Sequence, residues 1–211
     1  MDIYPQFVFI LGPIILLAAS FPVLICLIWA AATHNRLVSL RNLIDNAWSN
    51  VDTKLRRRYD LIPNLVETVR FYAAHERAVI EPVVQARANA VSSTGSPEEQ
   101  AAAENELVRL LRSLFAVCES YPVIKADQNF LALQRELVNT EDRIQAARRF
   151  FNGNVRECNS LVECFPSSLI ARTFGFRQRQ YFEIEDAIQW QAPPVWHDTP
   201  RAADPHSSAL Q

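Results

Sequence analysis

A long uncharged segment at the amino terminus most constrains what this chain can fold into. No Asp, Glu, Lys or Arg occurs from Ile3 to Thr33, and Ile, Leu, Val, Ala and Phe dominate the segment. A helix needs about 20 apolar residues to cross the hydrocarbon core of a bilayer, so this segment is long enough. We therefore predict a transmembrane helix over residues 7–33, preceded by a short extracytoplasmic segment, residues 1–6.

A cleaved signal peptide is the alternative interpretation of the same segment. Ala30-Ala31-Ala32 would fit an A-x-A cleavage site. However, the first residues carry no Lys or Arg, and the apolar run far exceeds the core of about 7–15 residues found in signal peptides. The sequence therefore favours an anchor that stays in the bilayer.

The positions of Lys and Arg predict how the span is oriented. None precedes it, whereas Arg36, Arg41 and Lys54 follow, with Arg56, Arg57 and Arg58 close behind. Flanking segments on the cytoplasmic side carry the excess of basic residues. We expect a protein of the inner (cytoplasmic) membrane with its N-terminus outside and the rest of the chain in the cytoplasm.

The remainder of the chain has the spacing of long amphipathic helices. Apolar residues recur at alternating steps of three and four from Leu37 to Leu55, as they do on one face of a helix. Pro63 predicts a kink or a restart, and a second apolar stripe follows it from Leu65 to Val84.

Two further helices are indicated downstream. Ser96, Pro97 and Glu99 have the pattern of an N-cap, a first helical residue and a capping box. This helix ends near Tyr121-Pro122, and the fourth runs from about Phe130 to Val162. Long helices bury their apolar faces best against one another. The predicted fold class is all-α: one N-terminal transmembrane helix followed by an elongated antiparallel bundle of about four long helices.

The same patterns predict the limits of the parts. The bundle covers residues 34–165, and a short apolar-basic segment over 166–192 either caps its end or binds a membrane or partner. The tail, 193–211, is rich in Pro, Asp, Ser and His, a composition typical of disorder.

Three blocks of the sequence resemble the LemA family of bacterial membrane proteins. The first, Asn35 to Glu76, contains LVSLRN, AWSNVD, LRRRYDLIPNLVETV and YAAHE. The second is NFLALQRELVNTEDRI, Asn129 to Ile144, and the third is FPSSLIARTFGF, Phe165 to Phe176.

The resemblance implies one N-terminal transmembrane helix, a long helical bundle and no established enzymatic activity. Some relatives resemble factors in magnetosome membrane formation, which implies a role in membrane organisation. Two departures stand out: His34 replaces the usual aromatic residue before the LV pair, and Arg70-Phe71 replaces a common Lys-Gly pair.

Motifs for catalysis or for cofactors are incomplete. Neither GxGxxG nor GxxxxGK[ST] occurs. His75-Glu76 resembles the start of HExxH, but the second ligand position holds Val79. No histidine has Glu three residues before it, as a di-iron bundle requires. We expect no metal, no other cofactor and no catalytic residues.

The cysteines and the net charge limit other possibilities. The four cysteines form no CxxC pair and no Cys/His group with zinc spacing, so we expect buried or half-buried free thiols. The net charge of -2 gives no field for nucleic acid. The expected partners are the bilayer, proteins of unknown identity and, since long amphipathic helices often self-associate, a second copy of the chain.

The basic cluster Arg56, Arg57 and Arg58 has two interpretations. It forms a solvated helix face paired with Asp52, Asp60 or Glu67, or it contacts anionic lipid. The first is favoured because a straight helix would place Arg57 about 36 Å beyond Thr33, several times the Debye length of about 8 Å.

We predict an interaction surface built from the family-like blocks. Its centres are Asp60-Pro63-Asn64 and His75-Glu76. The candidate residues are Arg41, Asn42, Trp48, Asp52, Arg57, Arg58, Asp60, Pro63, Asn64, His75, Glu76, Gln134, Glu141 and Arg143. Alternatively, Trp48 belongs to the core. Glu141 and Arg143 could instead form exposed or interhelical ion pairs.

Three functions are compatible with these patterns. The preferred hypothesis is a membrane-anchored scaffold or adaptor. The second is a sensor with a four-helix ligand-binding domain, which would require the domain to be exported. The third is a metal-dependent hydrolase that uses His75 and Glu76.

Overall fold

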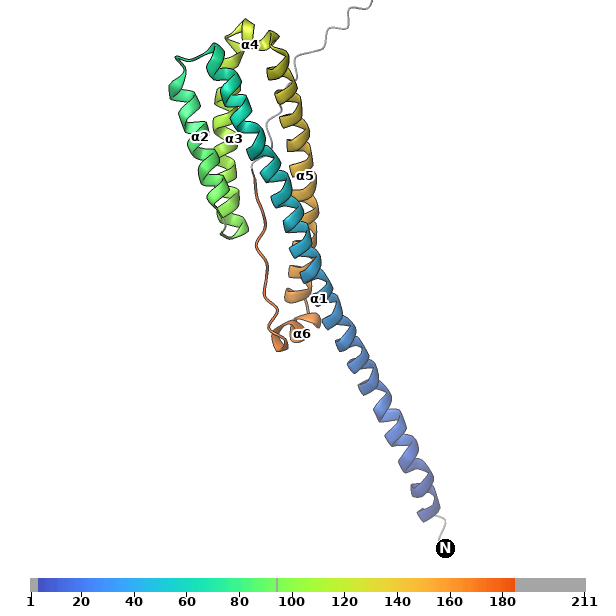
Figure 1. Ribbon diagram of the computed structural model, residues 1–211. Coiled ribbons are helices and arrows are strands. Elements are labelled where there is room, and N and C mark those ends of the chain that lie inside the picture. The colour runs from blue at the N-terminus through green and yellow to red at the C-terminus, as the bar shows by residue number, and fades with distance from the viewer. Residues whose placement is uncertain (1–3, 94, 185–211) are drawn as a thin grey trace, which may run out of the picture.

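A single helix of 69 residues, α1 (Tyr4–Tyr72), forms the axis of the molecule (Figure 1). The computed structural model describes residues 4–93 and 95–184, with side chains from Ser20 onward. At 1.5 Å per residue α1 is about 100 Å long. Its N-terminal part extends alone, whereas its C-terminal part lies inside a bundle.

The all-α prediction is confirmed, since the described residues form helices and no strand. The predictions for residues 1–3, for residues 185–192 of the apolar-basic segment and for the tail 193–211 lie outside the described residues.

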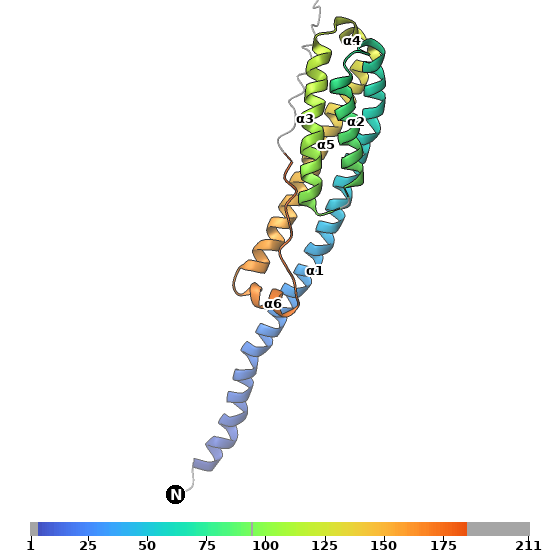
Figure 2. The ribbon, with the colours of Figure 1, turned by 90° about the vertical axis from the view of Figure 1, so that its left-hand side faces the viewer.

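Four of the described helices run antiparallel in the bundle. They are the C-terminal part of α1, α2 (Arg77–Ser92), α3 (Pro97–Glu119) and α5 (Gln128–Glu163). Helix α1 packs along α5, and α2 packs along α3. Figures 1 and 2 show that the shorter α2–α3 pair covers only the half of α1 and α5 that lies far from the N-terminus. The short helix α4 (Pro122–Ala126) connects α3 to α5 at that far end.

The predicted apolar faces form the core. On α1 the buried residues follow the expected steps of three and four: Leu37, Leu40, Ile44, Ala47, Val51 and Leu55. On α5 they include Phe130, Leu137, Ile144, Ala147, Phe151 and Cys158. Because both helices keep this spacing over many turns, their stripes stay in register along the whole bundle.

Helix α1 continues through Pro63, so of the two alternatives predicted there, a kink or a restart, the restart was wrong. A proline inside a helix costs about 3 kcal/mol because it removes a hydrogen bond and crowds the preceding turn. The neighbouring Leu61, Ile62 and Leu65 are buried in the core. Burying each such side chain stabilises the fold by about 1.5–3 kcal/mol, which offsets the cost. The chain turns instead at residues 73–76, where no Gly or Pro signals a break.

The predicted start of the third helix is confirmed. The Ser96 hydroxyl accepts a hydrogen bond from the backbone N–H of Glu99, and the Glu99 carboxylate accepts one from the Ser96 N–H. This capping box satisfies N–H groups that have no partner within the helix.

A tight turn after α6 (Ser167–Thr173) sends the chain back along the bundle. Gly175 has φ +73°, a left-handed conformation that favours glycine. The N–H of Phe176 donates to the carbonyl of Ala171 at 2.9 Å, the bond of a Schellman motif. Residues 176–184, which we call the strap, then run in an extended conformation beside α1 and α5 (Figure 1).

Two asparagines on α5 hold the strap by its backbone. The Asn152 amide both donates to and accepts from the backbone of Phe182, each at 2.9 Å. Asn159 does the same with Arg179, at 2.9 and 2.8 Å. Seven residues of helix rise about 10 Å, and three extended residues span about the same distance. The two amides therefore match the strap without strain.

The strap completes the core in the half that α2 and α3 leave open. Phe182 is fully buried. Its ring lies 5.2 Å from that of Trp48, centroid to centroid, and the ring of Phe151 lies 5.3 Å from that of Trp48. These aromatic contacts tie the strap to both long helices.

We predict that Asn152→Ala releases the strap. The substitution removes two hydrogen bonds worth about 1 kcal/mol each, so trypsin should cut after Arg177 and Arg179 faster than in the parent protein. Asn139→Ala is the control, because Asn139 is exposed on the same helix. Equal cleavage rates in the two variants, measured on detergent-solubilised protein, would show that the clamp does not hold the strap.

Candidate functional site

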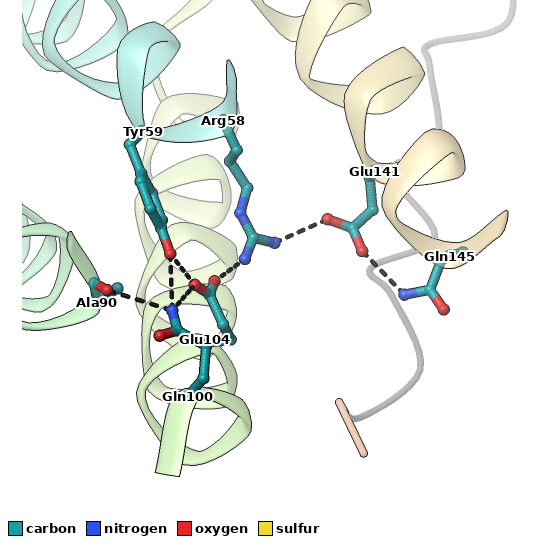
Figure 3. A network of polar contacts seen from close by, with 7 residues as sticks. All are labelled: Arg58, Tyr59, Ala90, Gln100, Glu104, Glu141 and Gln145. Carbon is teal, nitrogen blue, oxygen red and sulfur yellow. Dashed lines mark hydrogen bonds and ion pairs between the residues drawn. The ribbon is translucent and has the colours of Figure 1, made fainter. Parts of the chain in front are cut away.

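The core of the bundle contains a charged network centred on Arg58. Its guanidinium lies between two carboxylates from different helices: Glu104 of α3, which Nη2 contacts, and Glu141 of α5, whose Oε2 lies 2.9 Å from Nη1 (Figure 3). The side chains of Arg58, Glu104 and Glu141 are only 2%, 0% and 5% exposed. One cation therefore joins α1, α3 and α5 in the interior.

Neutral polar groups complete the network. The Tyr59 hydroxyl donates to Glu104, and the Gln100 amide contacts the Tyr59 hydroxyl, Glu104 and the carbonyl of Ala90 on α2 (Figure 3). Gln145 donates to Glu141 at 2.9 Å. Burial and the adjacent Glu104 raise the pKa of Tyr59 well above its usual value, so it stays a neutral donor.

The network holds helices together, and nearly all of its buried polar atoms have a hydrogen-bond partner. Burial opposes the charge of Arg58, yet Glu104 and Glu141 outweigh it and raise the pKa of Arg58. Among the described buried side chains, Arg58 Nε is the atom without a hydrogen-bond partner. Because a misplaced helix would leave a charge unpaired in the interior, we interpret the network as a device that fixes helix register.

Arg58 and Glu141 therefore do not belong to the predicted surface. The expectation that the arginines lie on a solvated helix face is correct for Arg56, which pairs with Asp52 at 2.8 Å. It is wrong for Arg58, which is buried. A signal was present in the sequence: Arg58 follows Leu55 by three residues and precedes Ile62 by four, so it falls on the buried face.

A groove lies between α1 and α5 at the far end of the bundle. Its volume is about 770 Å³. On its rim Phe71 is 81% exposed, and Arg57 and Glu136 form an ion pair across it at 3.0 Å. The lining residues are Arg57, Leu61, Asn64, Glu67, Thr68, Phe71, Tyr72, Asp127, Asn129, Ala132, Leu133 and Glu136.

Hydrogen bonds set the charge in this groove. Asp127 accepts bonds from the Phe130 N–H and from the Tyr72 hydroxyl, both at 2.8 Å. These bonds hold the pKa of Asp127 below its usual range and raise the pKa of Tyr72. Asp127 and Glu67 place two carboxyl groups beside apolar Leu61 and Leu133, a lining suited to a polypeptide with basic and apolar side chains.

The predicted surface residues are spread over several places. Arg57 and Asn64 line the groove. On α1, Asp60 and Pro63 are exposed outside its lining, and Arg41 and Asn42 are exposed nearer the N-terminus.

The remaining predicted residues lie on α5, in the core or at the turn. On α5, Arg143 is exposed and Gln134 half-buried. Trp48 packs against the core, which confirms the alternative interpretation. His75 is exposed in the turn after α1, and Glu76 accepts a hydrogen bond from the Tyr121 hydroxyl at 2.7 Å. Within residues 20–93 and 95–184, no group of three His, Cys, Asp or Glu could hold a metal ion.

The cysteines of the described region are free thiols. Cys118 and Cys158 are buried, and burial raises the pKa of Cys118 to about 11. Cys26, on the apolar part of α1, and Cys164 are both exposed, so the expectation of burial was wrong for these two. Cys164 follows the end of α5. It is exposed because the chain leaves the bundle at this point to enter α6.

Comparison with known proteins identifies the family. A profile of the LemA family matches residues 47–196. The chain belongs to the LemA family. This LemA chain is 25% identical over 179 residues to the magnetosome protein MamQ of Magnetospirillum gryphiswaldense, an alignment that covers 73% of this chain and 66% of MamQ.

Two further LemA relatives have similar coverage. Magnetosome protein MamQ 2 of Paramagnetospirillum magneticum is also 25% identical, over 73% of this chain and 66% of its own length. Protein LemA of Metamycoplasma hominis is 22% identical, over 72% of this chain and 69% of its own. The chain thus spans just under two thirds of the length of the MamQ proteins. The LemA match includes the buried network and the groove.

We predict that Arg58→Met strongly destabilises this LemA bundle. It leaves Glu104 and Glu141 buried without their cation, a loss of about 3–5 kcal/mol. Arg57→Met is the matched control, since its exposed pair with Glu136 contributes about 0–1 kcal/mol. Urea unfolding in detergent, followed by helical circular dichroism, compares the two variants. Similar losses for both would contradict a structural role of the buried network.

Proposed function

We propose that this LemA protein is a single-pass membrane scaffold, with the N-terminus outside and the bundle in the cytoplasm. The observation that carries the proposal is the continuity of α1, which passes without a break from an apolar, uncovered segment into the core of the bundle. Anchor and bundle therefore form one rigid rod rather than two parts joined by a linker.

The exposed side chains of the N-terminal part of α1 support an anchor. From Phe21 to Trp29 large apolar residues are exposed, among them Leu24, Leu27 and Ile28. This helix is long and apolar enough to cross a membrane. A row of uncovered aliphatic side chains is unfavourable in water and favourable in lipid, so the bilayer is the natural environment for this segment.

The rod carries the groove away from the membrane. From Thr33 to Phe71 the helix rises about 57 Å, so an α1 that spans the membrane up to Thr33 would hold the groove well beyond the lipid headgroups. A partner bound there would be held at a set distance from the surface. The MamQ relatives are named as magnetosome proteins. By similarity we infer a part in organising a cellular structure rather than in transforming a small substrate.

The orientation can be tested with Cys164. It is exposed, whereas Cys118 and Cys158 are buried and the exposed Cys26 lies within the apolar segment. In spheroplasts a membrane-impermeant maleimide should modify Cys164 only after the membrane is permeabilised. The control is Asp2→Cys in a Cys164→Ser background, which should react in intact spheroplasts. Reaction of Cys164 before permeabilisation would place the bundle outside the cell.

The scaffold role can be tested at the groove. A photo-crosslinking phenylalanine analogue at Phe71 should join the protein to one dominant partner, and Glu67→Lys should abolish the product by reversing charge in the groove. The same analogue at Phe150, exposed on α5 outside the groove, is the control. A product containing two copies of this chain would identify self-assembly. Identical products at Phe71 and Phe150 would exclude the groove as the binding site.

A further inference from the structure

Helix α6 has its amphipathic character reversed relative to a helix on a soluble protein. It buries the small residues Ser167, Ser168 and Ala171. Its outward side carries Leu169, 55% exposed, and the residues that flank the helix, Phe165 and Phe174, are 81% and 59% exposed. A soluble bundle normally turns such side chains inward, so three exposed ones within ten residues indicate a surface with an apolar partner.

The position of α6 beside the apolar segment of α1 favours lipid as that partner. The Phe174 ring lies 4.5 Å from the ring of His34 on α1, and Phe176 lies 5.8 Å from it, centroid to centroid. His34 directly follows the uncharged segment that ends at Thr33. Figures 1 and 2 show α6 beside α1 at the end of the bundle nearest the N-terminus.

The depth also agrees with a bilayer interface. Trp29 is the last large aromatic residue of the uncharged segment, and such rings mark the edge of the hydrocarbon core. From Trp29 to His34 the helix rises about 8 Å, close to the thickness of one headgroup layer, about 5–8 Å. If α1 spans the membrane, Phe174 therefore lies at the level of the headgroups.

Charge around α6 favours anionic lipid. Arg172 and Arg177 are exposed, and neither forms an ion pair within the described part of the chain. Nearby acidic groups are already engaged: Glu157 pairs with Arg36, and Glu163 accepts a hydrogen bond from Gln178. Exposed aromatic rings beside unpaired arginines are typical of segments that lie in an anionic membrane surface.

We propose that Phe165 to Arg177 form a juxtamembrane collar that lies in the headgroup layer and binds anionic lipids of the membrane that α1 spans. The inference rests on the proposed anchoring by α1. The collar has a clear use, because the uncharged segment is about 46 Å long as a helix, whereas the hydrocarbon core is about 30 Å thick. Such a helix could slide or tilt, and the collar fixes the depth and the angle of the rod.

The test places an environment-sensitive fluorophore on Cys164 of the full chain, with Cys26→Ser, reconstituted in vesicles. Spin-labelled lipids with a shallow acyl-chain label should quench it more strongly in vesicles that contain phosphatidylglycerol than in pure phosphatidylcholine. Arg172→Gln and Arg177→Gln should each lower the ratio of bound to detached collar about fivefold in the anionic vesicles. Replacing Phe165, Leu169 and Phe174 by Gln should remove quenching altogether. These residues are exposed, so the bundle should remain folded.

A matched probe at Val123→Cys, in a Cys164→Ser background, reports from an exposed apolar position at the far end of the bundle and should not be quenched. Flotation with the vesicles reports anchoring by α1 separately. If the protein floats but Cys164 is quenched no more than the Val123 position, the collar does not contact lipid and the inference fails. Protein that does not float overturns the anchor and the collar with it. Shielding of Cys164 that is independent of lipid and lost on dilution would instead assign the patch to a second copy.

Discussion

The packing of one face of α1 against α5 determines the rest of the molecule. Apolar residues at steps of three and four, from Leu37 to Val69, stay buried over many turns. The same helix carries the apolar segment that extends beyond the bundle. Because backbone hydrogen bonding is continuous through Thr33 and His34, the direction of the apolar segment also sets the direction of the bundle. A flexible linker at this point would leave the two parts independent.

The elements that cover the α1–α5 pair differ between the two halves of the bundle. In the far half α2 and α3 cover the pair, and the charged network of Arg58, Glu104 and Glu141 lies in the interior. In the half nearer the N-terminus the strap covers the α1–α5 pair, and Asn152 and Asn159 form hydrogen bonds with the strap backbone. Both arrangements provide partners for buried polar groups, which would otherwise be costly. The network joins helices, whereas the asparagines hold a segment that has no regular structure of its own.

The two ends of the rod present different chemistry. Near the apolar segment, α6 exposes Phe165, Leu169 and Phe174 beside arginines. At the far end the groove combines carboxylates with apolar side chains, and Phe71 stands on its rim. An apolar-basic end and an end with a groove, held apart by one helix, are compatible with the proposed scaffold.

The sequence by itself determined the helices and their buried faces, because apolar spacing and the capping pattern at Ser96 are local properties. It located part of the candidate site, since Arg57 and Asn64 do line the groove. Only the tertiary structure decided that Arg58 and Glu141 pair in the interior, because their ion pair joins positions 83 residues apart and the spacing that puts a residue on a buried face does not say which residue it pairs with. It alone placed the strap, whose conformation has no period of its own and depends on side chains of α5, and it alone brought α6 beside His34.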